Sequence, residues 1–550
     1  MQALSRCSAT RSSPPDPFAQ RSTKLATAGP RQSSLPAVPG CMAATSRKRA
    51  RTEPTPPPAD KPKVFNDAVL GHVELHPCCV AVVDTREFQR LRGLKQLGPT
   101  EYVYPAAGHT RFAHSLGVSF LAGKLVEKLS HQVSPPLHIT EREILCVKLA
   151  GLCHDLGHGP LSHTFEKFVR MRRPHLKWRH EHASAALFAK VVRDEKVAAV
   201  FGRYHLTSDD VHFVQELIFG DRSDAPSSWK WRGLPSEKHF LFEIVSNHRN
   251  GIDVDKFDYF RRDAFHLNIP VSFDCDRLIM CARAIPDDRG VFTVAYPEKE
   301  VWNVYELFRT RFNLHKRAYQ HRVSSAIERM LCDVLLSAEE SGFRYRGRRL
   351  SEAMDCLEAY ATLTDSVFDV IDFLAVDDAS LRPAAELLEH VRRRHLHRHV
   401  GEVVVPPLKR DDICQLSDDD LLRAIARHST PAGRQALLAG AYASKFDITF
   451  GMGDNNPVER VFFYLRSDDA VGRVLKGSQV STFVPRHFAE SYVRLFLRDR
   501  DDGELFDVAS SALQAWERAV LGRVESAIAP SPPQKGVSRR PPRPPPPRTP

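Results

Sequence analysis

The sequence contains no apolar run long enough to cross a membrane, and its first residues lack the apolar stretch of a secretory signal peptide. We therefore expect no membrane contact and no secretion. Cysteine gives no sign of a disulfide framework, because eleven cysteines are scattered over 550 positions without a CxxC pair. Only Cys78 and Cys79 are adjacent. These thiols are expected to be reduced and mostly buried, in a nuclear or cytosolic protein. The chain also has no internal repeat.

A basic folded core is lacking too, although the formal net charge is +11. Residues 1–63 contain eleven Lys/Arg and three Asp/Glu, and residues 529–550 contain five Lys/Arg and no acid. The residues between them are therefore close to neutral. Any general affinity for single-stranded RNA or DNA should come from these basic tails.

The chain is long enough for a large core and two lobes. Residues 1–62 are rich in Ser, Pro and Arg and are expected to be disordered, as is a Pro/Arg tail at 529–550. Between them we expect a catalytic domain at 63–335 and a smaller α+β lobe at 336–528 with a regulatory or oligomerisation role. The basic cluster Arg47–Arg51 indicates nuclear import, with a solvated charge run as the alternative.

The fold class predicted is mainly α, with small sheets in the C-terminal lobe. Helical patterns begin near Arg111, at Thr140, after His180 and across Val301–Leu331. Alternation at 446–450 and 458–466 predicts strands, and residues 487–499 are predicted to return to a helix.

One stretch stands out, from Thr140 to Glu166. Thr140 and Glu143 have the spacing of a capping box, and the helix that follows is apolar nearly all round, as expected of a core helix. It ends in His154-Asp155. Unpaired, these two groups would cost several kcal/mol of desolvation in a core, whereas a shared divalent cation removes that cost.

Further polar residues have spacings that bring them to the same place. Arg111 and His114 lie three apart on one predicted helix, so they face the same way. Asp255, Tyr259 and Asp263 are spaced four apart on a second predicted helix. They therefore share one face of it, and we expect this face to border a polar cleft. Additional candidates are Lys256 and the histidines His158, His163 and His180.

The order His114, His154-Asp155, Asp255 resembles the signature of HD-domain metal-dependent phosphohydrolases. The blocks HTRFAHSLGVSFLAGKLV, LAGLCHDLGHGPLSHTFE, FEIVSNHRNGIDVDKFDYFRRD and LHKRAYQHRV are similar to the SAM-and-HD-domain deoxynucleoside triphosphate triphosphohydrolases of vertebrates. The similarity runs from about residue 63 to about residue 525. An HD pair alone is a weak signal, but four blocks in the right order are a specific one.

The resemblance implies an enzyme that cleaves dNTPs into deoxynucleoside and inorganic triphosphate, lowering dNTP pools and thereby restricting viruses. It implies one divalent transition metal (Fe, Mn or Zn) held by His114, His154, Asp155 and Asp255, with Mg²⁺ accompanying the nucleotides. His163 is the expected proton donor, with His158 and His180 positioning phosphate and water. Arg111 and Lys256 are expected to clamp the triphosphate. The remaining substrate-binding residues implied are Gln96 and Asp263 at the 3′-hydroxyl, Tyr259 and Tyr319 under the sugar, and Leu97 and Arg311.

The same resemblance implies two activator sites and a homotetramer. A guanine nucleotide (GTP or dGTP) would contact Lys63, Val64, Asn66, Asp84, Gln89 and Arg92. A dNTP would bridge subunits through Arg283, Lys299, Asn303, Arg317, His321 and Lys476. The chain departs from the family pattern at Pro297, where a basic residue is usual, at Tyr104, where Phe is usual, and in residues 1–62, which replace the SAM domain.

Two other functions remain open from the residues. The HD site could act on nucleoside monophosphates or cyclic nucleotides, which the triphosphate clamp of Arg111 and Lys256 and the Tyr259/Tyr319 pair argue against. The protein could instead bind nucleic acid and carry a vestigial pocket, which the intact H…HD…D set argues against.

Overall fold

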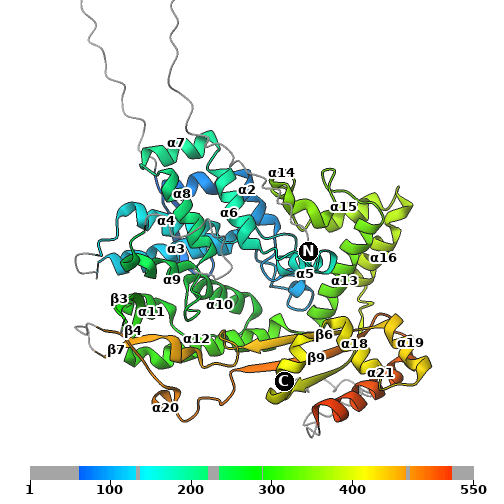
Figure 1. Cartoon of the computed structure of the whole chain (residues 1–550). Coiled ribbons are helices and arrows are strands. Elements are labelled where there is room, and N and C mark those ends of the chain that lie inside the picture. Colours follow the sequence, from blue (N-terminus) through cyan, green and yellow to red (C-terminus); the bar gives the residue numbers. More distant parts are fainter. Residues whose placement is uncertain (1–60, 132–136, 221–233, 288, 466–470, 523–550) are drawn as a thin grey trace, which may run out of the picture. The chain divides into compact units, whose positions relative to one another are not determined.

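The structure, a computed structural model, describes residues 61–131, 137–220, 234–287, 289–465 and 471–522 (Figure 1). The two basic tails and the Arg47–Arg51 cluster lie outside the described residues, except for residues 61–62.

Helices dominate, as the fold class predicted (Figure 1). Between residues 61 and 340 they are α1 (Pro77–Val83), α2 (Arg86–Gln89), α3 (Arg111–Ser130), α4 (Glu141–Cys153), α5 (His163–Arg172), α6 (His180–Val191), α7 (Glu195–Arg203), α8 (Ser208–Phe219), α9 (Phe242–Val245), α10 (Val254–Leu267), α11 (Cys275–Cys281), α12 (Val301–Leu314) and α13 (Arg322–Glu340). Beyond them follow α14 (Leu357–Tyr360), α15 (Val367–Leu374), α16 (Arg382–Arg392), α17 (Arg410–Gln415), α18 (Asp418–Ala426), α19 (Pro431–Gly440), α20 (Gly477–Val480) and α21 (Gly503–Trp516).

The strands of the described chain form three small sheets. The first is the antiparallel pair β1 (Lys63–Asp67) and β2 (Gly71–Leu75). The second has the order β3-β4-β7-β8, with β3 (Arg283–Pro286), β4 (Phe292–Pro297), β7 (Phe462–Tyr464) and β8 (Arg473–Val474); β4 and β7 run parallel. The third is antiparallel in the order β5-β9-β6, with β5 (Arg398–Val405), β9 (Ala489–Leu497) and β6 (Ala441–Thr449).

Helix α3 packs against both α4 and α10. Helix α4 begins at the expected capping box, because the Thr140 hydroxyl accepts the Glu143 N–H and the Glu143 carboxylate accepts the Thr140 N–H. Its apolar side chains are buried on all sides, so its C-terminal end is fixed deep inside the protein. Residue 154, the C-cap, follows directly.

The prediction of a helix at 487–499 is wrong, because these residues contain β9, the central strand of the third sheet. Both faces of β9 are covered. Val493 and Leu495 join the core formed with α18 and α21, while Phe496 packs against Ala326 and Tyr442 on the other face. A strand buried on both faces has a continuous apolar sequence, and periodicity cannot distinguish it from a buried helix.

Two other predictions need adjustment. The helical stretch Val301–Leu331 is interrupted, because α12 ends in a π-helical turn at His315–Tyr319 and α13 starts after His321. The strand expected at 458–466 covers only Phe462–Tyr464, whereas the one at 446–450 belongs to the longer β6. Helix α13 runs across residue 335, so the lobe boundary placed there is not a break in secondary structure, and the division into lobes stays a prediction.

No helix among the described residues combines the length and the apolar content that a bilayer crossing requires.

Candidate active site

The predicted ligand residues come from three helices that meet at one point. His114 lies on α3, His154 and Asp155 follow α4, and Asp255 lies in the first turn of α10. His114 Nε2 is 3.1 Å from Asp255 Oδ1 and 3.3 Å from Asp155 Oδ2. His154 Nε2 is 3.4 Å from Asp155 Oδ1 and 3.4 Å from Asp255 Oδ1. Two imidazoles and two carboxylates thus converge, as predicted.

The unsatisfied atoms show that this arrangement fits a metal ion. The Nε2 atoms of His114 and His154 are buried and make no hydrogen bond, although carboxylate oxygens lie close by. Leaving two buried ring nitrogens without partners is costly. His114, His154 and Asp155 each offer a ligand atom within 4.8 Å of the others, the arrangement of a cation site. Imidazole and carboxylate suit a divalent transition metal.

The other ring nitrogen of each histidine is held by the protein. His114 Nδ1 is 2.8 Å from Asp258 Oδ2, and His154 Nδ1 is 2.9 Å from the Gly151 carbonyl. These contacts turn both Nε2 atoms toward the cation position, as the outer partners of metal-binding histidines do.

Asp258 is itself fixed by charge. Its two oxygens accept hydrogen bonds of 2.8 and 2.9 Å from Arg262, whose guanidinium also contacts Asp67 at 2.8 Å. Gly117 leaves the space for this pair, because a Cβ there would stand 2.0 Å from Asp258 Oδ1. Sequence reasoning missed Asp258, since its role depends on a contact between residues 144 positions apart.

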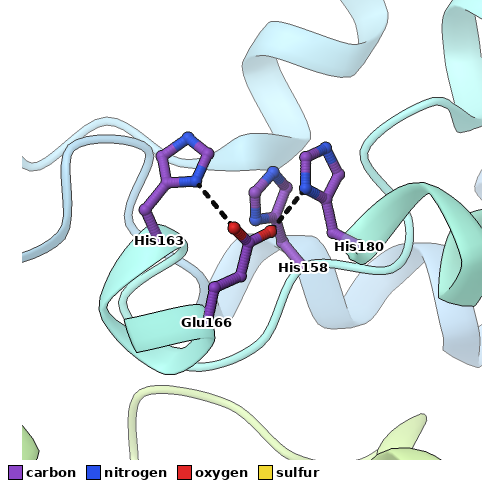
Figure 2. A group of neighbouring side chains, drawn as sticks. All are labelled: His158, His163, Glu166 and His180. Carbon is purple, nitrogen blue, oxygen red and sulfur yellow. Dashed lines mark hydrogen bonds and ion pairs between the residues drawn. The ribbon is translucent and has the colours of Figure 1, made fainter. Parts of the chain in front are cut away.

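A second group of polar side chains lies beside the first. Glu166 on α5 is placed between two imidazoles, with Oε1 2.6 Å from His180 Nδ1 and Oε2 3.5 Å from His163 Nδ1 (Figure 2). His158 stacks on His180 at 3.8 Å between ring centroids, and its Nε2 is 3.3 Å from Asp155 Oδ1. Glycine again permits the approach, because a Cβ on Gly157 would lie 2.2 Å from the His180 carbonyl.

The two neighbouring histidines have opposite charge preferences. Burial, Arg111 and His180 lower the pKa of His158 well below its usual range. Burial also disfavours charge on His180, but Glu181, Glu166 and Asp155 outweigh it and raise its pKa to about 9. At neutral pH His158 is therefore neutral and His180 protonated, the kind of divergence that sets different roles for similar groups.

Both groups open into one pocket of about 820 Å³. Arg111 lines it and holds Asp155, with Nη1 2.5 Å from Oδ2. Every predicted catalytic, substrate and metal residue lines this pocket except His114, which is fully buried behind it: Gln96, Leu97, Arg111, His154, Asp155, His158, His163, His180, Asp255, Lys256, Tyr259, Asp263, Arg311 and Tyr319.

At one part of the pocket wall, Asp263 is held by two partners. The Tyr319 hydroxyl donates to Oδ2 at 2.5 Å, and His109 Nε2 is 2.7 Å from Oδ1. Arg311 donates a hydrogen bond to the Thr449 carbonyl. The chain just beyond Thr449, at Gly451 and Met452, forms part of the pocket wall. Sequence reasoning did not single out His109 or this segment.

The residues expected at the activator sites lie in several places. Lys63 Nζ is 3.6 Å from Asp84 Oδ1, and Arg92 donates to Gln89 at 2.8 Å, while Val64 and Asn66 lie on β1. Lys299 and Asn303 line a surface depression of about 600 Å³ together with Arg277. Arg283 instead lies over the Tyr464 ring. Three others are found elsewhere: Arg317 in the π-helical turn, His321 at the start of α13 and Lys476 before α20.

The comparison with protein families identifies the class. The HD domain model matches residues 111–221, the stretch that begins with Arg111 and contains His114 and His154-Asp155. The fold and the site are thus those of a mainly α HD-domain protein.

Curated relatives narrow the class further. The deoxynucleoside triphosphate triphosphohydrolase SAMHD1 of Bos taurus is 41% identical over 460 residues, covering 81% of this chain and 77% of the relative. The Homo sapiens protein of the same name is 40% identical, covering 81% and 72%. A SAMHD1 homolog from Dictyostelium discoideum is 33% identical, covering 81% and 79%. The chain belongs to the SAMHD1 family of deoxynucleoside triphosphate triphosphohydrolases.

Proposed function

We propose that this protein hydrolyses dNTPs to deoxynucleoside and inorganic triphosphate in the 820 Å³ pocket. The observation that carries the proposal is the convergence of His114, His154, Asp155 and Asp255 at the wall of a pocket that also holds three more histidines and several cationic side chains.

These four residues would hold the divalent transition metal (Fe, Mn or Zn), and Mg²⁺ would accompany the nucleotide. When bound, the metal supplies Lewis-acid activation of water and neutralises charge on the α-phosphate. Arg111 and Lys256 bind phosphate oxygens from the pocket wall. Water attacks the α-phosphorus and the bond from phosphorus to O5′ breaks. His163 donates a proton to the leaving O5′, and the proton released by the attacking water restores that histidine.

The sugar would lie near Asp263. Its carboxylate and Gln96 accept and donate at the 3′-hydroxyl, and the rings of Tyr259 and Tyr319 pack beneath the sugar, leaving no room for a 2′-hydroxyl. Leu97 and Arg311 complete the lining. The pairing of Asp263 with Tyr319 supports this arrangement, since it holds ring and carboxylate together.

Product analysis tests the activity. Purified protein incubated with dGTP and Mn²⁺ or Mg²⁺ should release deoxyguanosine and intact triphosphate, resolved by chromatography. Phosphate or pyrophosphate as the product would instead indicate another nucleotide phosphohydrolase and contradict the proposal.

Activation by GTP or dGTP and a dNTP, and assembly into a homotetramer, are part of the same proposal. The guanine-nucleotide residues include the Lys63–Asp84 pair, and Asp84 can accept from both N–H groups of a guanine edge. Lys299, Asn303 and Arg277 line the same surface depression, which supports a nucleotide site there. Arg277 is therefore a further candidate, in addition to the residues predicted from the sequence. Sedimentation with and without GTP plus dNTP tests the assembly; an unchanged mass would contradict it.

Nuclear localisation, binding of single-stranded nucleic acid and restriction of viruses through lowered dNTP pools remain proposals that rest on the basic tails and the family. Deleting both tails should leave dNTP turnover intact and weaken RNA binding. Turnover lost together with RNA binding would contradict this separation.

A further inference from the structure

We propose that His158, His163, Glu166 and His180 form a second transition-metal site, distinct from the HD site, whose occupation by an ion such as Zn²⁺ switches the enzyme off. The ligand atoms of these four side chains all lie within 4.8 Å of one another. Figure 2 shows the Glu166 carboxylate lying between His163 and His180, with the His158 ring beside His180.

The ligand set selects the ion. Three imidazoles and one carboxylate are ligands for Zn²⁺, Co²⁺ or Fe²⁺ and poor ligands for Mg²⁺ or Ca²⁺, which prefer oxygen. The site should therefore ignore the Mg²⁺ that accompanies nucleotides and respond to transition metals.

An unused acceptor supports the assignment. His158 is 1% exposed, its Nε2 faces Asp155, and its Nδ1 is buried without a hydrogen-bond partner. Such a nitrogen is costly in a protein interior unless something binds it. A metal ion would bind His158 Nδ1. The contacts that Glu166 makes with His163 and His180 do not involve this nitrogen.

Binding an ion requires a local rearrangement, because Glu166 Oε1 and His180 Nδ1, now 2.6 Å apart, must separate, and His163 Nδ1, now 3.5 Å from Glu166 Oε2, must turn toward the ion. Zn–N bonds of about 2.0–2.1 Å place tetrahedral ligands about 3.3 Å apart. His163 has the most room to adjust, because its side chain is 63% exposed at the first turn of α5. His158 and His180 are held together by their stacking and Glu166 lies on α5, so these three side chains start close together; an ion would displace the proton that His180 Nδ1 shares with Glu166.

The effect on activity follows from the proposed function and rests on it. The proposed proton donor, His163, would be bound to a cation and unable to carry a proton. His158 and His180 would no longer be available to phosphate. An ion here would thus stop turnover while leaving the HD site loaded.

Metal counting tests the site without reference to activity. Protein stripped with a chelator and then dialysed against micromolar Zn²⁺ should bind two ions per chain by elemental analysis. His154→Ala should bind one, and the double variant His163→Ala/Glu166→Gln should bind one. His395→Ala, at an exposed position just after α16 and beside His390 of that helix, should still bind two.

Should the double variant fail to fold, His163→Ala alone decides, because its exposed side chain contributes little to packing. We expect at least a tenfold weaker second binding event by calorimetry. A wild-type count of one, or two ions retained in the double variant, would overturn the site.

A kinetic measurement then tests the switch. In protein whose HD site is loaded with Mn²⁺, filling the second site with Zn²⁺ should lower dGTP turnover at least tenfold, and partial chelation should restore it. Full turnover with two ions bound would overturn the regulatory role. If no dNTP is hydrolysed under any condition, the proposed function fails, while the count of ions still decides the second site.

Discussion

Asp365 Oδ1 accepts the Leu161 N–H at 2.6 Å, and its Oδ2 accepts the Lys95 N–H at 2.9 Å. One carboxylate therefore ties together two loops that reach the pocket, the one carrying Gln96 and the one leading to His163. The second loop needs such support, because Leu161 and Ser162 have φ values of 53° and 58°, which are unfavourable for residues with side chains.

The first prediction concerns this bridge. Asp365→Asn offers one acceptor oxygen and turns an amide N–H₂ toward the other backbone N–H, so one hydrogen bond becomes a repulsive contact. We expect a loss of about 1–3 kcal/mol in the free energy of unfolding and a clear fall in kcat. Asp377→Asn, at an exposed position after α15, is the control and should change neither. Equal effects of the two changes in denaturant titration and dGTP turnover would contradict the role of the bridge.

The charge of the same residue predicts a pH dependence. Burial raises the pKa of Asp365 to about 6, and the nearby charge of Glu101 adds to this effect. The two backbone hydrogen bonds and Lys95 lower the pKa but do not outweigh burial. A carboxyl whose pKa is higher in the folded state binds its proton more tightly there. Its contribution to the free energy of unfolding is therefore greatest below pH 4 and falls as the pH rises toward 6, by at most about 3 kcal/mol. The difference in stability between wild type and Asp365→Asn, measured from pH 4 to pH 7, should follow this curve; a constant difference would exclude it.

Local patterns were predicted better than the sheets. The structure shows the Thr140 capping box and the buried apolar α4, and the residues spaced four apart on α10, Asp255, Tyr259 and Asp263, line one pocket. The partners Asp258, Glu166 and Asp365 were not found, because a carboxylate that acts by contact with residues of another element carries no local pattern. Strand β9 was assigned to a helix for the same reason, since only its neighbours β5 and β6 define it as a strand.

A glycine next to the metal site gives a sharp test of packing. A Cβ at Gly117 would stand 2.0 Å from Asp258 Oδ1 and 2.6 Å from Arg262 Nη2, so Gly117→Ala must displace this buried ion pair. We expect a loss of at least 3 kcal/mol in stability or a large fall in bound metal. Gly202→Ala on α7 meets nothing within 4 Å and should be neutral or slightly stabilising. Thermal unfolding measures the stability and elemental analysis the bound metal. A Gly117→Ala variant with the stability and metal content of the wild-type protein would refute the packing argument.

Two substitutions at Tyr319 separate the contribution of its ring to sugar selection from that of its hydroxyl. Tyr319→Phe removes the 2.5 Å hydrogen bond to Asp263 but keeps the ring, so we expect a rise in KM for dNTPs with ribonucleotides still excluded. Tyr319→Ala removes the ring as well and should admit ribonucleoside triphosphates. The measurement is the ratio of kcat/KM for dGTP and GTP as substrates. If Tyr319→Ala rejects GTP as strongly as wild type, the ring does not exclude the 2′-hydroxyl.

Loss of the metal ligands should abolish activity without unfolding the protein. His154→Ala removes one buried ring nitrogen, Nε2, that has no hydrogen-bond partner, so the site loses a metal ligand but no hydrogen bond at that atom. We expect turnover to fall at least a thousandfold with reduced metal content, and Asp155→Ala to behave alike, because both residues would bind the same cation. Chelation of the wild-type protein should reproduce the loss, and added Mn²⁺ should restore activity to wild type but not to either variant. Turnover retained by both variants would show that the HD residues do not hold the catalytic ion.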